Sequence, residues 1–194
     1  MTLDRRAIEE AVYLGQSRLD AEKNRFHQQY RLPVSRPPVD WIDVITPYHR
    51  VVLAAEARAR LGDRIFGQRE AAAALNAAPY PIELLIELTF HPLNAFVNVP
   101  EYDVALFRPP STTRIRPRSA NRYPRFGPRT ESTAPFLPNP NAAPIFGAGQ
   151  PMTGGTMLVQ FGADVIDPSG RYEIAIADAK QELARVVLDL GRLR

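Results

Sequence analysis

Cysteine is absent from this chain of 194 residues, and lysine nearly so, with only Lys23 and Lys180 against 22 arginines. Without cysteine the chain cannot form disulfides, zinc–thiolate sites, iron–sulfur clusters or a cysteine nucleophile. No apolar run approaches the length of about 18 residues that a bilayer-spanning helix needs, so we expect no membrane span.

The start of the chain, MTLDRRAIEE, is charged from residue 4 and lacks the apolar core of a signal peptide. This leaves two interpretations, a cytoplasmic protein or an exported one whose signal has been removed. We favour the exported, extracytoplasmic protein.

The familiar patterns of catalytic and metal sites are also missing. The three histidines, His27, His49 and His91, have no His-x3-His or His-Glu-x2-His spacing, so we expect no metal site. No Gly-x-Ser-x-Gly sequence is present. The glycine-rich residues 146–156 lead into an expected strand, whereas a phosphate loop leads into a helix. We therefore expect no cofactor and no enzyme activity.

The histidines and two acids of an expected strand are weaker candidates for a catalytic or binding site. We expect His27 and His49 to be surface or capping residues, whereas His91 follows a strand beside an irregular turn and is a candidate minor site. Glu83 and Glu87 share one face of an expected strand, which we interpret as its solvent-facing side rather than as a catalytic pair. A site formed by His91, Glu87 and Tyr102 is the enzymatic alternative.

Hydrophobic periodicity predicts helices first and strands second. Apolar residues spaced as on a helix predict helices over 3–30, from Pro47 to about 61 with Thr46 as its cap, and from 67. Period-two alternation predicts strands over 82–90, 98–107, 155–166 and 171–178, the last two as a hairpin. Residues 39–45 are either a short strand or a docking segment. Residues 184–190 fit a helix or a strand, and we favour a strand that completes a meander.

This order of elements predicts an α+β fold with the N-terminal helices packed on a small antiparallel sheet or β-sandwich. We divide the chain into a helical region, 1–78, and a β region, 79–194, that form one cooperative domain. The β region contains a long proline- and arginine-rich loop, 108–153, between strands. Proline is about twice as frequent as usual, 19 of 194 residues, and ten of the prolines lie in this loop.

The most unusual stretch is RIRPRSANRYPRFGPR, residues 114–129, here called the arginine strip. Residues 108–131 carry seven arginines against the single acid Glu131, so this segment is +6 while the rest of a chain of net charge +3 is −3. The strip could bind nucleic acid or another anionic polymer, it could lie over the fold with its arginines on acids elsewhere in the chain, or it could be disordered. We favour the segment that lies over the fold. Its candidate binding residues are Arg114, Arg116, Arg118, Arg122, Tyr123, Arg125, Phe126 and Arg129.

One short stretch resembles a known class of domain. The sequence DPSGRYEIAIAD, 167–178, is similar to an edge seen in extracytoplasmic β-sandwich modules, and the resemblance covers only these residues. Our leading hypothesis is a non-enzymatic binding or structural module in a bacterial envelope or secreted setting. We expect it to bind a protein partner or a second copy of itself, with binding of an anionic polymer by the arginine strip as the alternative.

Overall fold

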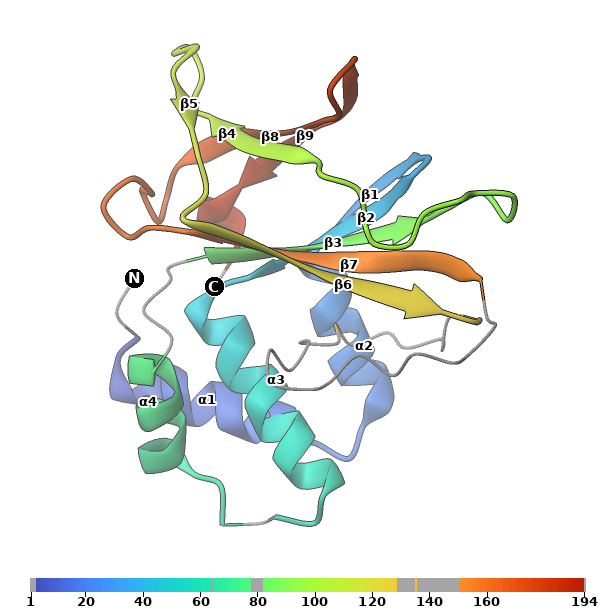
Figure 1. The fold of residues 1–194 in the computed structure, drawn as a ribbon. Helices are drawn as coiled ribbons and strands as arrows, with labels where there is room; N and C mark the ends of the chain where they lie inside the picture. The colour runs from blue at the N-terminus through green and yellow to red at the C-terminus, as the bar shows by residue number, and fades with distance from the viewer. Residues whose placement is uncertain (1–2, 64, 78–81, 129–134, 136–150, 194) are drawn as a thin grey trace.

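A computed structural model of the chain describes residues 3–63, 65–77, 82–128, 135 and 151–193. These residues form three layers, with helices below a five-stranded sheet and a four-stranded sheet above it (Figure 1). The helices are α1 (Arg5–Gly15), α2 (Asp20–Gln29), α3 (Pro47–Arg60), α4 (Gln68–Ala77) and the short 3-10 helix Leu190–Arg192. The strands are β1 (Arg31–Arg36), β2 (Val39–Ile45), β3 (Ile82–Thr89), β4 (Asp103–Phe107), β5 (Arg114–Ile115), β6 (Ser119–Phe126), β7 (Met152–Phe161), β8 (Arg171–Ala177) and β9 (Glu182–Asp189). The predicted α+β fold is confirmed.

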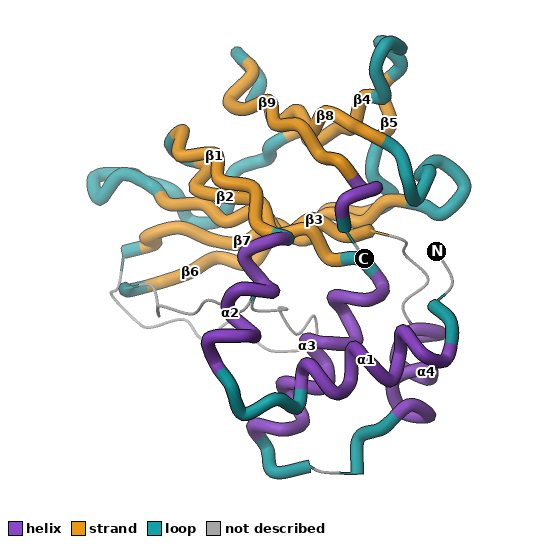
Figure 2. The backbone as a smooth tube through the Cα atoms, turned by 180° about the vertical axis from the view of Figure 1, so that it is seen from behind, coloured by secondary structure: helices purple, strands orange, loops and turns teal. Residues whose placement is uncertain are grey.

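The five-stranded sheet has the order β1-β2-β3-β7-β6, and every neighbouring pair is antiparallel. Strand β3 is its centre and pairs along its whole length with β7, from Ile82 opposite Phe161 to Thr89 opposite Gly154. The view from behind shows the helices gathered on one face of this sheet and the second sheet on the other (Figure 2). The central sheet is therefore covered on both sides.

The four-stranded sheet has the order β5-β4-β8-β9 and is also antiparallel. The predicted hairpin over 155–178 is wrong, because β7 pairs with β3 and β6 whereas β8 pairs with β4 and β9. A strand with one apolar face fits a sandwich of two sheets as well as a hairpin, so its alternation does not reveal its neighbours. The strand preferred at 184–190 is confirmed as β9.

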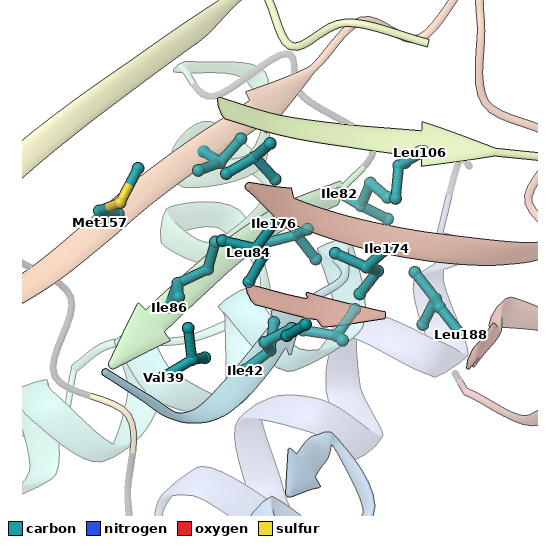
Figure 3. Close-up of a cluster of buried hydrophobic side chains, with 14 of the residues drawn as sticks. Val39, Ile42, Ile82, Leu84, Ile86, Leu106, Met157, Ile174, Ile176 and Leu188 are labelled. Atoms are coloured by element: carbon teal, nitrogen blue, oxygen red, sulfur yellow. The ribbon is translucent and has the colours of Figure 1, made fainter. Parts of the chain in front are cut away.

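Apolar side chains from both sheets fill the space between them (Figure 3). Ile82, Leu84, Ile86 and Leu88 alternate along β3 toward this core, and each is fully buried. They meet Leu106 and others from the second sheet, namely Val104, Ile174, Ile176 and Leu188. The intervening residues of β3 point the other way, toward the helices, because successive side chains of a strand alternate between its faces.

The helices form their own apolar cluster, in which α1 crosses α3. Its buried members include Ile8, Ala11 and Val12 from α1 and Val51, Val52 and Ala55 from α3. The single helix expected over 3–30 is wrong, because α1 ends at Gly15 and α2 starts at Asp20. Ser17 between them uses its hydroxyl to accept a hydrogen bond from the Leu19 N–H, and such local bonds compete with helix continuation.

Thr46 caps α3 as predicted, with its hydroxyl accepting from the His49 N–H at 3.2 Å and Pro47 following in the first turn. The sequence does not predict three of the strands, and one of them, the two-residue β5, lies in the expected loop and joins the four-stranded sheet. The other two contain proline. Strand β1 contains Pro33, and β6 lies within residues 108–153, where the sequence shows no periodicity. Strands β1 and β6 are the edge strands of the five-stranded sheet, the position where a proline in a strand is tolerated.

Residues 129–134 and 136–150 of the loop expected over 108–153 lie outside the described residues. The proposed division at residue 78 also stays a prediction. None of the described helices is long and apolar enough to cross a membrane.

Replacing Gly15 with alanine is expected to destabilise the fold. A Cβ atom there would lie 2.7 Å from the Ala55 Cβ and would also meet the Val52 carbonyl oxygen, so α1 and α3 would have to move apart. We expect a loss of about 1–3 kcal/mol in the free energy of unfolding, measured by urea denaturation. Gly67→Ala is the matched control, because its nearest neighbours would lie 3.6 Å away. Equal stability of the two variants would contradict the tight crossing.

Candidate functional site

The helix-facing side of the five-stranded sheet carries acids, and each acid meets an arginine. Asp43 of β2 accepts two hydrogen bonds from the Arg31 guanidinium, at 2.8 and 2.9 Å. Glu83 of β3 forms an ion pair with Arg50 of α3. The expectation that Glu83 marks a solvent-facing strand side is therefore wrong, because helix α3 covers it and only 5% of the residue is exposed.

Glu87, the second acid of β3, does not pair with Glu83. Its carboxylate accepts from Arg125 Nη1 at 3.0 Å, and both side chains are largely buried. Glu83 is held separately by Arg50 and by Gln160, whose amide donates to it at 2.6 Å. The two carboxylates are thus charge partners of two different arginines.

The arginine strip includes β5 of the four-stranded sheet and β6 of the five-stranded sheet, and its arginines reach acids in other parts of the chain. Arg118 meets Asp164 at 2.8 Å and Arg122 meets Glu101 at 3.0 Å. Arg114 is paired with Asp103, and Arg125 with Glu87 as above. This is the arrangement in which the strip lies on the fold and neutralises acids of the same chain. Most of these pairs are solvent-exposed and contribute about 0–1 kcal/mol each, so the buried Arg125 pair matters most.

The remaining residues of the strip have different environments. Tyr123 packs against the cluster formed by Ile45, Leu53, Leu85 and Leu158, and burial together with the charge of Glu83 raises its pKa. Phe126 packs against the core between the sheets. Arg116 is exposed and has no ion pair or hydrogen bond to a described residue. Arg129 lies outside the described residues.

His91 accepts hydrogen bonds that stabilise the loop between β3 and β4. Its Nδ1 accepts from the Leu93 N–H at 3.1 Å, and its carbonyl oxygen accepts from both the backbone and the side chain of Asn94. Asn94 also donates to the Met152 carbonyl at 2.9 Å and accepts from the Phe96 N–H. These bonds fix a turn that displays Leu93, Phe96 and Val97 to solvent.

The enzymatic alternative finds no support in this geometry. Tyr102 packs against the core between the sheets, whereas Glu87 lies on the opposite face of β3. His91 is exposed and engaged in its own turn. No group of three or more histidines and acids among the described residues could hold a metal ion.

The structure brings together two histidines that the sequence did not connect. His27 in the last turn of α2 and His49 in the first turn of α3 are each at most 1% exposed, with His27 Nδ1 3.0 Å from His49 Nε2. On its other side, His27 Nε2 lies 2.9 Å from a carboxylate oxygen of Glu56, two turns further along α3. The expectation that both histidines lie at the surface or cap helices is wrong. We call this set the buried histidine cluster.

Hydrogen bonding assigns the protons of the buried histidine cluster. His49 Nδ1 lies 3.0 Å from the Val44 carbonyl oxygen, which can only accept, so Nδ1 carries the proton and Nε2 accepts. His27 Nδ1 therefore donates to His49, and His27 Nε2 and Glu56 share one further proton. This chain of three bonds links the end of β2 to α2 and α3.

The environment of the cluster shifts two of its pKa values. Burial lowers the pKa of His49 to about 3, and a hydrogen bond to Val44 opposes this only in part. Its ring lies against Tyr30, with the ring centroids 4.2 Å apart, which keeps water away. Burial alone would raise the pKa of Glu56, but the hydrogen bond from His27 and the charges of Arg60 and Lys23 lower it. His49 is thus a neutral acceptor, and Glu56 stays ionised.

Glu56 also connects the cluster to the surface. Its second oxygen lies 2.7 Å from Arg60 Nη2 and 3.7 Å from Lys23 Nζ. These residues line a half-open cavity of about 450 Å³ between α2, α3 and the link that precedes α2. The full lining is Gln16, Ser17, Arg18, Lys23, Glu56, Ala59, Arg60 and Asp63, which we call the helix pocket.

Sequence reasoning missed this site, although one signal was present. His49, Val52 and Glu56 are spaced three and four apart, so they share one face of α3. An acid on the same face as buried valine needs a partner inside the protein. The sequence does not show that His27 supplies it, because His27 arrives from another helix.

We expect the imidazole of His49 to stay neutral from pH 8 down to about pH 4. Its depressed pKa means that the unfolded chain binds a proton more readily than the folded one. The contribution of His49 to stability is therefore complete above the unfolded pKa of about 6.5. It falls by up to about 1.4 kcal/mol per pH unit as the pH drops from there toward 3. Nitrogen-15 spectra of the rings would show the Nδ1–H tautomer, and titration near pH 6.5 would contradict the assignment.

Arg125→Gln is expected to destabilise the protein by about 2 kcal/mol, because it removes a charged partner of the largely buried Glu87. Arg116→Gln, in the same strip, is the matched control and should change stability by less than about 0.5 kcal/mol. Urea denaturation of both variants measures the difference. If neither change has an effect, the strip does not help to hold the fold.

Comparison of the chain with protein-family models, curated proteins and solved structures finds no match in any of the three. The function of the protein therefore has to be inferred from the contacts described above.

Proposed function

We propose that the protein is a non-enzymatic module that binds another protein through the loop between β3 and β4. The observation that carries this proposal is the exposure of three apolar side chains within five residues. Leu93 is 87% exposed, Val97 89% and Phe96 45%. Single exposed apolar residues are common, but a group of them on one loop is typical of a binding surface.

The loop is also held in shape before any partner arrives. Asn94 ties it to Met152 of β7, and His91 closes its turn. The Phe96 ring packs edge-on against the buried Phe90, with the ring centroids 5.1 Å apart. A loop that is already ordered loses less conformational entropy on binding, which favours affinity. These contacts support a role for Leu93, Phe96 and Val97 as anchors in a partner's apolar pocket.

The alternative, binding of nucleic acid or another anionic polymer by residues 114–129, has less support. Arg114, Arg118, Arg122 and Arg125 each have an acid of the same chain as a partner. Phosphates would have to displace those acids. The envelope or secreted setting stays a prediction.

Photo-cross-linking in the native host tests the proposal. A photoreactive residue in place of Val97 should give one discrete adduct, because the loop would lie within the interface. Leu93→Asp in the same chain should reduce that adduct at least about tenfold, since a charge would enter the partner's apolar pocket. Leu93 is almost fully exposed, so this change leaves the fold intact.

Ile65, which is 86% exposed in the link between α3 and α4, is the matched control position. An adduct of twice the mass of the chain would identify a second copy as the partner. Any other single mass would identify a different protein. No adduct at position 97, or equal adducts at positions 97 and 65, would reject the proposal.

A further inference from the structure

We propose that the helix pocket binds a small ligand through an oxyanion, a carboxylate or a phosphate group. The pocket is the mouth of the buried histidine cluster and lies in the helical layer, whereas the β3–β4 loop belongs to the sheets. Its volume of about 450 Å³ is within the range of about 300–1,000 Å³ that small-molecule sites occupy. This inference does not depend on the proposed protein-binding function.

Cations converge on the pocket from three different elements. Arg18 comes from the link between α1 and α2, Lys23 from α2 and Arg60 from α3. Lys23 is nearly buried, its side chain 12% exposed, so its charge lies at the floor of the pocket rather than in bulk water. A charge at a partly buried position is screened less by solvent and salt, and it therefore attracts an anion more strongly.

The two acids of the pocket already have partners inside the protein. Glu56 is engaged by His27, Arg60 and Lys23. Asp63 accepts from the Ile65 N–H at 3.0 Å and lies 3.7 Å from Arg58. Because these oxygens are occupied, a ligand cation would find few acceptors in the pocket.

Hydrogen-bond donors of the pocket, by contrast, are still available to a ligand. Arg18 is exposed and makes no hydrogen bond or ion pair to a described residue. Arg60 holds Glu56 through one nitrogen while its side chain is 62% exposed. A guanidinium can give two parallel hydrogen bonds to a carboxylate or phosphate, which suits Arg18 and Arg60 to this role.

Asp20 offers a second, independent way to change the positive charge that Lys23 presents to the pocket. It lies 2.9 Å from Lys23 Nζ and is 85% exposed, so it lowers the positive potential of the pocket from outside. Removing Arg18 and removing the charge of Asp20 must therefore change anion affinity in opposite directions. A purely structural ion network would not give this pair of results.

The experiment is a titration of the nitrogen-15-labelled chain with sodium phosphate and, separately, sodium acetate at pH 7 and constant ionic strength. We expect saturable shifts of the amide signals of Ser17, Arg18, Ala59 and Arg60. Arg18→Gln should weaken binding about tenfold, the loss of one charge-assisted hydrogen bond. Asp20→Asn should strengthen it about threefold, because Lys23 then loses its competing partner.

Arg69→Gln on α4 is the matched control, because Arg69 is exposed, lies outside the pocket and has no partner among the described residues. It should leave the affinity unchanged, and thermal denaturation of each variant confirms that the fold is intact. A preference for phosphate would assign a tetrahedral oxyanion, and a preference for acetate a carboxylate. Unsaturable shifts, an effect of Arg69→Gln equal to that of Arg18→Gln, or no strengthening by Asp20→Asn would overturn the proposal.

Discussion

Strand β3 lies at the centre of a sheet that is covered on both faces, and charged side chains on that sheet must therefore find partners within the protein. One face of β3 is apolar and forms the core between the sheets. The other face carries Glu83, which contacts helix α3, and Glu87, which contacts the edge strand β6. A buried carboxylate without a partner would cost several kcal/mol. Arg50 from α3 and Arg125 from β6 remove that cost, and in doing so they tie the helices and the edge strand to the centre.

In the helical layer, too, a buried carboxylate has partners from other elements, but one of them is a histidine. Glu56 is buried on α3, and its partners include an imidazole from α2 in addition to Lys23 and Arg60. His49 then connects the same network to the last part of β2 through Val44. The position of α2 thus depends on a short chain of hydrogen bonds as well as on apolar packing. These hydrogen bonds end at Glu56, which also lines the helix pocket, so the same side chain holds the helices together and forms part of the proposed binding site.

Local patterns in the sequence predicted most elements and few of the contacts. Thr46 and Pro47 marked the start of α3, and the alternation from Ile82 to Phe90 marked β3, because both signals depend on near neighbours in the chain. Strand β6 was hidden because Pro124 and its arginines break the usual pattern of a strand. The pairing of β7 was hidden for another reason. Its apolar residues need a covered face, and many neighbours satisfy that need.

The candidate sites likewise differ in how far the sequence indicates them. An excess of arginine over 108–131 against an acidic remainder indicated that the strip could neutralise the fold, and the pairs of Arg118 and Arg122 have that form. The buried histidine cluster joins residues 22 and 29 positions apart, so no local spacing could reveal it. The exposed residues of the β3–β4 loop could not be recognised either, since exposure is decided by the packing of the whole molecule.

The two prolines at the borders of the five-stranded sheet have a consequence for how copies of this protein meet. Pro33 lies in β1 and Pro124 in β6, and neither has an N–H group to offer to an incoming strand. A strand added at either border would therefore lack a backbone hydrogen bond at the proline, which disfavours growth of the sheet there. At these two borders, contact between copies is therefore favoured through side chains, such as those of the exposed β3–β4 loop, over extension of the sheet by its backbone.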